Sequence, residues 1–543
     1  MRNVGWLLVL VAASAIAQPN NTANTHGTVD FKTSCAPAVA TEFNHAVALL
    51  HSFEYDEARD VFAGVAKSDP KCAMAKWGEA MTYFHGLWGE YKAEDGAKAA
   101  ADARGLAAAN AATTAREKAY VGAISEIFSD AAVKATQREN NKPDEQGYSE
   151  FSDDAARDYA EKMAALHKTY ADDDEATIFY ALALDVTAPR SDKTHANNRA
   201  CTALLNPMLE KIPNNPGVAH YLIHCNDNPE MAKDGLVAAR KYANIAPASA
   251  HATHMPAHIF SQLGLWDEVV ESDKASVHAA EVDPHASVCE KVGHTLHAMH
   301  FLTFGLVQRG DLKEAREIVA RARKIPGQWP GGDKCNDYGD LPLAVYALET
   351  GDWESVKTVK ISETGYSDPL WLAKGVAAAR TGDMATAKES EAQFVTKRDS
   401  HGKHSHHVGD SGAEVMRLVV AAWMTHEAGK KHEAVDMMRK SADMQERLGG
   451  SMSVMKPVRE FLADMLLMDG RAQEALTEYQ AVLEKHPMRF NAAYGAGTAA
   501  FESGDRESAR KHYSELMKFA HGDERPEIAT AKKRLAETVA VKQ

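Results

Sequence analysis

Hydrophobic residues along most of the chain recur every three or four positions, which is the period of an amphipathic helix. The first such segment includes Ala46 to Leu50, and a second, with Ala58 and Phe62, follows it closely. Asp69-Pro70 ends this pair, because proline cannot continue a helix. Further periodic segments alternate with short stretches rich in glycine, proline and polar residues, which predict turns. The pattern therefore predicts an all-α chain of antiparallel helix hairpins.

Turn glycines recur through the second half of the chain, and five of the seven are followed five residues later by an alanine. They are Gly264, Gly310, Gly351, Gly382, Gly429, Gly470 and Gly504. The last two are 34 residues apart, and so are Ala475 and Ala509, and Tyr479 and Tyr513. Small residues let two antiparallel helices approach, an aromatic ring fills the space between them, and glycine makes the turn.

Residues 46–88 and 250–520 resemble tetratricopeptide repeats (TPRs) in this spacing, most strictly over 470–513. The resemblance implies an all-α, TPR-like α-solenoid of stacked antiparallel helix hairpins. It also implies an inner groove that binds a protein or peptide, and it implies no chemistry.

The stretch at 326–340 is rich in glycine and proline and is the candidate boundary within this solenoid. Before it we expect an N-terminal, histidine-bearing helical-repeat solenoid over residues 35–325. After it we expect more regular TPR-like repeats over 341–543. Residues 18–34 are polar and rich in turn-forming residues, so they are expected to be a disordered tether.

Residues 1–17 have the features of a secretory signal peptide. Arg2 is basic, Trp6 to Ala13 is an apolar run, and Ala15-Ile16-Ala17 is a small-x-small cleavage site before Gln18. The apolar run is too short to span a bilayer, and no later segment approaches the roughly 20 apolar residues required. We therefore expect a soluble exported protein, periplasmic or secreted, without a membrane span.

Composition narrows the class of partner. The 543 residues exceed what one compact core requires, and 45% of them are hydrophobic, so the chain is ordinary globular material. The net charge of −15 leaves no basic face for a nucleic acid. We expect a protein or peptide partner and no nucleic acid.

Six cysteines follow the predicted cleavage site: Cys35, Cys72, Cys201, Cys225, Cys289 and Cys335. An even number in an exported chain permits disulfides, and six cysteines allow 15 pairings. Bridges between Cys35 and Cys72 and between Cys201 and Cys225 are expected, since neighbouring repeats bring those segments side by side. The chain has no CxxC motif, which argues against a zinc ribbon or a thiol-redox site.

Four of the chain's 25 histidines form a pattern. His220 and His224 are four residues apart, and His254 and His258 repeat this pair 34 residues later. Asn215-Pro216 predicts a helix start, which puts the first pair one turn apart on one helix face. His300 lies ten residues before Gly310, just as His254 lies ten residues before a turn glycine.

Stacked helices are thus expected to bring one set of side chains towards a common ligand groove. The set is His220, Tyr221, His224, His254, His258 and His300. The four paired histidines, His220, His224, His254 and His258, can hold zinc or copper, with Asp227 and Glu230 as nearby carboxylates. Alternatively, these histidines form a hydrogen-bonded layer between helices, with Tyr221 and backbone carbonyls as partners.

The sequence favours a binding function. The export signal combined with the HYLIH and HMPAHIF segments resembles exported bacterial TPR proteins of unknown biochemistry. The preferred hypothesis is an exported TPR-like scaffold that binds a protein, peptide or small ligand in its concave groove. The alternative is a histidine-based protein that binds divalent transition metals, or a metal-dependent hydrolase. No acidic motif completes a known site, so no catalytic residue is assigned and the sequence argues weakly against an enzyme. A second histidine cluster, at 401–407, predicts adventitious metal affinity.

Overall fold

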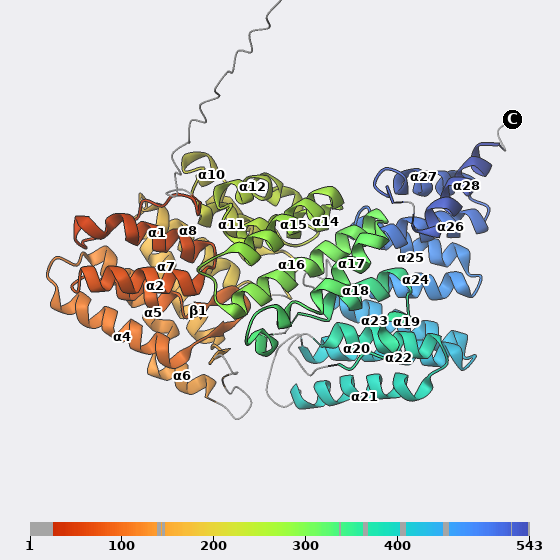
Figure 1. Ribbon diagram of the computed structural model, residues 1–543, viewed down its shortest axis with the longest axis horizontal. Coiled ribbons are helices and arrows are strands. Elements are labelled where there is room, and N and C mark those ends of the chain that lie inside the picture. Colours follow the sequence, from red (N-terminus) through yellow and green to blue (C-terminus); the bar gives the residue numbers. More distant parts are fainter. Residues whose placement is uncertain are drawn as a thin grey trace, which may run out of the picture.

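The computed structural model describes residues 25–137, 143, 147–189, 191–335, 338–361, 367–401, 409–448, 456–522 and 524–540. The predicted signal peptide at 1–17 and most of the histidine cluster at 401–407 lie outside these residues. Helices dominate, and helices that follow one another in sequence pack side by side from one end of the molecule to the other (Figure 1).

The N-terminal part begins with the hairpin of α1 and α2. Its helices are η2 (Pro37–Val39), α1 (Ala40–His51), α2 (Tyr55–Ser68), α3 (Ala73–Met81), η3 (Gly86–Trp88), α4 (Ala93–Ala109), α5 (Ala115–Ile127), α6 (Asp130–Thr136), α7 (Asp153–Thr169), α8 (Asp174–Val186), α9 (Ala196–Leu205) and α10 (Met208–Lys211). A small antiparallel sheet, in the order β1-β2-β3, sits beside them. Its strands are β1 (Phe84–His85), β2 (Glu90–Tyr91) and β3 (Ser149–Glu150).

The middle part, green in Figure 1, carries the histidine-rich segments. Its helices are α11 (Pro216–Cys225), α12 (Ala232–Ile245), α13 (Ala250–His254), α14 (Pro256–Leu263), α15 (Trp266–Val282), α16 (Val288–Arg309), α17 (Leu312–Ala322), η4 (Pro326–Gln328) and η5 (Gly332–Cys335). The short helices η4 and η5 occupy the proline- and glycine-rich stretch at 326–340. The main cluster of buried hydrophobic residues includes members on both sides of that stretch.

The C-terminal part is a regular series of hairpins. Its helices are α18 (Leu341–Thr350), α19 (Glu354–Lys357), α20 (Asp368–Arg380), α21 (Met384–His401), α22 (Gly409–Glu427), α23 (Lys431–Leu448), α24 (Val458–Met468), α25 (Ala472–Lys485), α26 (Phe490–Glu502), α27 (Arg506–Leu516) and α28 (Pro526–Ala540). No helix among the described residues is both long enough and apolar enough to cross a bilayer.

All seven predicted turn glycines lie at or just after helix ends. Each has a positive φ, between 70° at Gly264 and 91° at Gly310. L-residues avoid this backbone region because Cβ approaches the carbonyl oxygen, whereas glycine enters it freely. The glycine series predicted from the sequence is therefore confirmed, and it marks the turns of successive hairpins.

The residues that repeat after 34 positions, Ala475 and Ala509 and Tyr479 and Tyr513, form the same packing arrangement in two successive hairpins. Ala475 and Ala509 are fully buried. The ring of Tyr479 lies directly against Gly495 of α26, and the ring of Tyr513 lies against Gly497 of the same helix. Glycine leaves the space that each aromatic ring fills, as the sequence pattern predicted.

Residues 25–34, expected to belong to a disordered tether, instead lie along the body of the molecule. The Thr28 amide donates to the Asn214 carbonyl at 2.9 Å. The Phe31 ring is buried and contacts the rings of Trp77 and Tyr120. The segment forms no helix or strand, but one aromatic side chain anchors it.

Three disulfides join segments that neighbour each other in the stack. Cys35 pairs with Cys72 and Cys201 with Cys225, which confirms both expected bridges. The third links Cys289 of α16 to Cys335 of η5 and so ties the stretch at 326–340 to the histidine-bearing helix.

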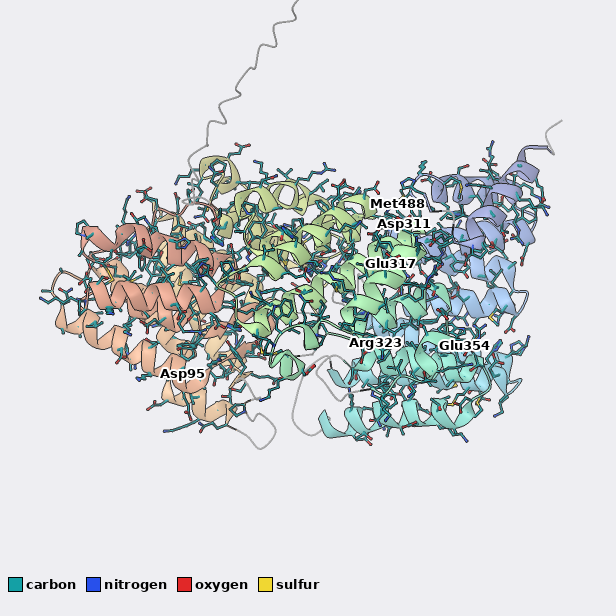
Figure 2. The ribbon with its side chains drawn as sticks, in the orientation of Figure 1. Asp95, Asp311, Glu317, Arg323, Glu354 and Met488 are labelled. Carbon is teal, nitrogen blue, oxygen red and sulfur yellow. A yellow bond between two sulfur atoms is a disulfide. The ribbon has the colours of Figure 1, made fainter. Side chains whose placement is uncertain are left out.

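The C-terminal hairpins contact the middle of the chain. The Met488 carbonyl, on the residue labelled in Figure 2, accepts a hydrogen bond of 2.7 Å from the Trp266 indole. Arg489 is buried and pairs with Glu349 at 2.6 Å and with Glu460 at 2.8 Å. The side chain of Gln308 on α16 donates to Glu349 as well. A buried polar network thus fastens α26 to α16, α18 and α24.

We expect Gly504→Ala to lower the free energy of unfolding by about 1 kcal/mol, because alanine resists the positive φ of 88°. A Cβ at this position meets no neighbouring atom, so the loss measures backbone strain alone. The measurement is urea unfolding followed by circular dichroism.

The matched control is Gly105→Ala, in the exposed interior of α4, where a Cβ also meets no atom. This substitution is expected to raise the free energy of unfolding by about 0.5–1 kcal/mol. Equal effects of the two substitutions would contradict the assignment of Gly504 as a turn glycine.

Candidate metal centre

Helix α11 presents the first histidine pair. The Asn215 side chain caps the helix by accepting from the Gly217 amide at 2.9 Å, and Pro216 occupies the first turn, as predicted. His220 and His224 therefore lie one turn apart on the same face of α11.

The second pair spans a break between two short helices. Ser249 caps α13 by accepting from the Ala252 amide, and Pro256 opens α14. His251 and His254 belong to α13, whereas His258 belongs to α14. The longer helix α16 contributes His294, His297 and His300.

The structure sorts the histidines into two groups of three. Triad 1 consists of His220, His224 and His251, and triad 2 consists of His254, His258 and His297. Within each triad one ring nitrogen from every residue lies within 4.8 Å of the other two. His220 and His254, equivalent in successive repeats, thus belong to different triads.

In triad 1 the Nε2 atom of His220 is central. It lies 3.0 Å from Nε2 of His251 and 3.1 Å from Nε2 of His224. On the other side of its ring, Nδ1 of His220 donates to the His51 carbonyl at 2.6 Å. Since a carbonyl only accepts, Nδ1 holds the proton and Nε2 of the neutral ring is a bare lone pair.

In triad 2 the Nε2 atoms of His254 and His258 are 3.1 Å apart. Nδ1 of His258 lies 2.8 Å from an Asp227 oxygen, and Nδ1 of His254 lies 2.6 Å from an Asp273 oxygen. Each pair is a carboxylate–histidine contact of the kind that orients metal-binding imidazoles in proteins.

Burial keeps the imidazoles neutral. It lowers the pKa of His220, His251, His254 and His297 well below the usual value, and neighbouring imidazoles lower it further. The pKa of His224 falls to about 3, again chiefly through burial. At neutral pH these rings therefore offer lone pairs rather than positive charge.

The two orienting carboxyls differ. Burial alone would raise the pKa of Asp227, but interactions with His258 and Gln262 outweigh it and the pKa falls below its usual value. Burial raises the pKa of Asp273 well above its usual value. A cation held by His254 would favour the ionised form of Asp273, because it supplies positive charge across the ring.

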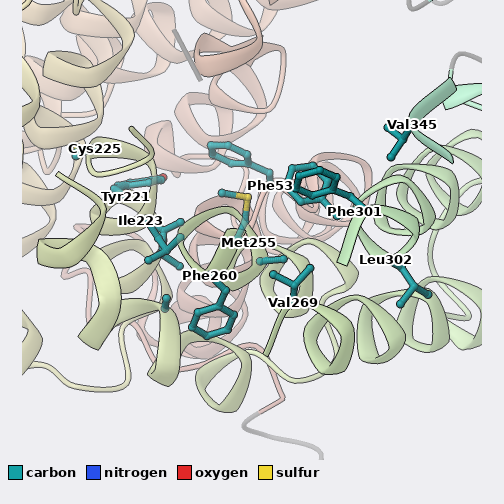
Figure 3. Close-up of a cluster of buried hydrophobic side chains, with 14 of the residues drawn as sticks. Phe53, Tyr221, Ile223, Cys225, Met255, Phe260, Val269, Phe301, Leu302 and Val345 are labelled. Carbon is teal, nitrogen blue, oxygen red and sulfur yellow. The ribbon is translucent and has the colours of Figure 1, made fainter. Parts of the chain in front are cut away.

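Phenylalanine rings flank both triads. The Phe53 ring lies 4.4 Å from the His220 ring and 5.4 Å from that of His251, between centroids. The Phe301 ring lies 4.6 Å from the His258 ring and 4.8 Å from that of His254. Figure 3 shows Phe53, Phe301 and Met255 in one hydrophobic cluster. Phe53 has a φ of 60°, a strained conformation for a bulky residue.

The other predicted groove residues lie close to the triads without joining them. Tyr221 is buried, and its hydroxyl lies 2.9 Å from Nδ1 of His51, whose Nε2 contacts Glu175. His300 is 6% exposed. Most of the predicted set, including His220 and His254, is thus buried between helices; His224 and His258 are partly exposed.

His251 and His297 complete the triads, and the predicted metal set omitted them. A regularity in the sequence marks both. His251 stands three residues before His254, and His297 stands three residues before His300. His254 and His300 are the equivalent positions ten residues before a turn glycine, so the third member of each triad comes from the same place in the next hairpin.

A separate cleft of about 480 Å³ lies between segments distant in sequence. Its walls are formed by Lys193, Glu230, Asp443, Glu446, Arg447 and Lys485. These side chains carry charges of both signs, and none is a triad member.

Comparisons with known proteins concern the fold. No protein-family model and no curated protein matches the sequence. A tetratricopeptide repeat protein from Parabacteroides merdae is 14% identical, with a TM-score of 0.28, over 53% of this chain and 98% of that one. The APC/C hetero-tetramer Cut9-Hcn1 gives 10% identity and a TM-score of 0.30, over 92% of this chain and 90% of that one. A monomeric IFIT1 mutant with Gppp-AAAA gives 11% identity and a TM-score of 0.34, over 82% of this chain and 90% of that one.

The fold is a TPR-like α-solenoid. This assignment rests on the stacked hairpins and their glycine turns, and the predicted all-α fold class is thereby confirmed. Such a scaffold suits protein binding in general and names no partner.

One buried carboxyl, that of Glu54, contacts the start of α13 and makes the stability of the fold depend on pH. The Ser249 hydroxyl, at the start of α13, donates to Glu54 at 2.5 Å. Burial raises the pKa of Glu54 to about 8. Because the pKa is higher in the folded state, the stabilisation is complete below the unfolded-state pKa and is lost as pH rises through about 8.

Metal-free wild-type protein is therefore expected to lose stability between pH 5 and 9 relative to Glu54→Gln, by on the order of 3–5 kcal/mol. Urea unfolding across this pH range measures the difference. Glu484→Gln, at an exposed position of α25, is the control and should parallel the wild type. A Glu54→Gln variant with the same pH profile as the wild type would rule out a neutral Glu54.

Proposed function

We propose that this chain is an exported TPR-like protein that binds transition-metal ions, one at each histidine triad. The observation that carries the proposal is the convergence of three ring nitrogens in each triad. Ligands at about 2.0–2.1 Å from a tetrahedral ion lie about 3.3 Å from one another. The observed Nε2 separations of 3.0–3.1 Å approach this value.

The hydrogen bonds at the outer ring nitrogens favour the same assignment. Because Nδ1 of His220 donates to the His51 carbonyl, its Nε2 lone pair points into triad 1, and the contact of Nδ1 of His258 with Asp227 turns Nε2 of His258 towards triad 2. A cation satisfies three lone pairs at once.

Imidazole ligands suit zinc and copper, so these are the proposed ions. Three protein ligands leave room for one further ligand on each ion. We propose binding rather than hydrolysis, because the nearest carboxyls, Asp227 and Asp273, already contact histidine rings and are not placed as free bases.

Binding of a protein or peptide partner is a second candidate function. The charged cleft between Lys193 and Glu446 favours it, because side chains of both signs suit a polar protein or peptide segment. The proposal is independent of the metal ions.

Export is supported by the paired cysteines. All six form disulfides, which persist in oxidising compartments such as the periplasm. Expression in a Gram-negative host should yield periplasmic protein whose N-terminus, determined by intact mass, is Gln18. Protein retained in the cytoplasm with residues 1–17 attached would contradict this.

Untagged protein in which His404, His406 and His407 are replaced by alanine is expected to bind two equivalents of zinc or copper. His224→Ala should remove the ion of triad 1, and His297→Ala the ion of triad 2, each leaving one equivalent. Asp227→Asn should weaken binding at triad 2 by 10–100-fold, because it loosens the orientation of His258. Plasma mass spectrometry after dialysis and competition with a colorimetric chelator provide the measurements.

The control for these variants is His278→Ala, which removes an exposed histidine of α15. It should retain both equivalents. Circular dichroism establishes that each variant is folded. Folded wild-type protein that retains no ion, or loss of both ions in His278→Ala, would refute the assignment.

A further inference from the structure

We propose that the two triads form a single paired-metal centre, in which two ions lie close enough to interact and to share a small bridging anion such as hydroxide. The inference rests on the proposed metal binding and goes beyond it, because two separate sites would satisfy the function above. The positions of the histidines on α13 and α16 support the inference.

Helix α13 belongs to both triads. His251 completes triad 1 and His254 begins triad 2, yet they are three residues apart on one short helix. Such residues are neighbours on the same face, with Cβ atoms about 5–6 Å apart. Along the helix axis, three residues advance by only about 4.5 Å.

Helix α16 repeats this arrangement opposite α13. The His251 ring faces that of His294 at 6.0 Å, and the His254 ring faces that of His297 at 4.5 Å. His294 and His297 are also three residues apart. The imidazoles thus form two successive rungs between the helices, so the triads are stacked one above the other with one helical turn between them.

Asp227 links the triads on the opposite side. It follows the end of α11, which carries the first pair, and it contacts His258 of triad 2 at 2.8 Å. Its backbone amide donates to the carbonyl of His224, a member of triad 1, at 3.2 Å. One acidic residue therefore contacts a member of each triad.

The histidines of the two triads differ in their exposure to solvent. His224, His258, His294 and His297 are partly exposed, whereas His220, His251 and His254 are buried. Phe53 lies against triad 1 and Phe301 against triad 2. An anion of a few atoms can reach the ions from the exposed rim, while the two rings limit the space for a bulky ligand. His294 belongs to neither triad and can hydrogen-bond an anion bound there.

Electron paramagnetic resonance of the copper(II)-loaded protein tests the pairing. The sample is the untagged full chain with the alanine substitutions at 404, 406 and 407, loaded with two equivalents of copper(II). We expect magnetic coupling, seen as a half-field transition or as a signal per copper less than half of that in the single-site variants. Azide, as the probe anion, should change the spectrum of the doubly loaded protein more than that of either variant.

His224→Ala and His297→Ala each supply a one-copper reference, and both replace partly exposed side chains, which limits the disturbance to the fold. Each should give an uncoupled signal of full intensity. Two bound coppers whose signals add without coupling would overturn the paired centre and leave metal binding intact. Folded protein that binds no copper or zinc would overturn both proposals.

Discussion

The register between successive helix hairpins is the constraint on which both histidine triads depend. Each triad takes two members from one hairpin and the third from the next, so a slip of one helix by a single residue would rotate its imidazole away. Several contacts hold this register. Ser249 fixes the start of α13 and bonds to Glu54, and the disulfide from Cys289 holds the start of α16. Close packing leaves the helices little freedom to slide.

The same burial that lowers the pKa of the imidazoles prepares them as ligands. A solvent-exposed histidine near neutral pH is partly protonated and must lose that proton before it binds a metal. Here desolvation has already removed the competition, while the His51 carbonyl and Asp227 decide which nitrogen of His220 and of His258 keeps its hydrogen. Tautomer and orientation are thus set by groups outside the triads.

Much of the architecture could be predicted from the sequence, because it depends on local rules. The turn glycines, the spacing at 470–513, the cap at Asn215 and two of the three disulfides follow from helix geometry and neighbouring repeats.

The grouping of the histidines could not be predicted in the same way. The 34-residue repeat suggested one site of four histidines, whereas translation along the stack places His220 and His254 in successive layers. Which neighbour completes a layer depends on how far one hairpin is rotated relative to the next, and the Pro256 break alters that locally. The packing of residues 25–34 depends on Phe31 and on partners, Trp77 and Tyr120, that lie far away in sequence.

The buried network around Arg489 affects how this solenoid would unfold. In an open array of repeats each unit contacts only its neighbours, so the terminal repeats can unfold before the rest. Here Arg489, Glu349 and Gln308 connect the last hairpins to the helix that carries His297. The last hairpins are therefore bonded to the middle of the array. The free energy that holds these terminal hairpins in place also resists the unfolding of the central helices.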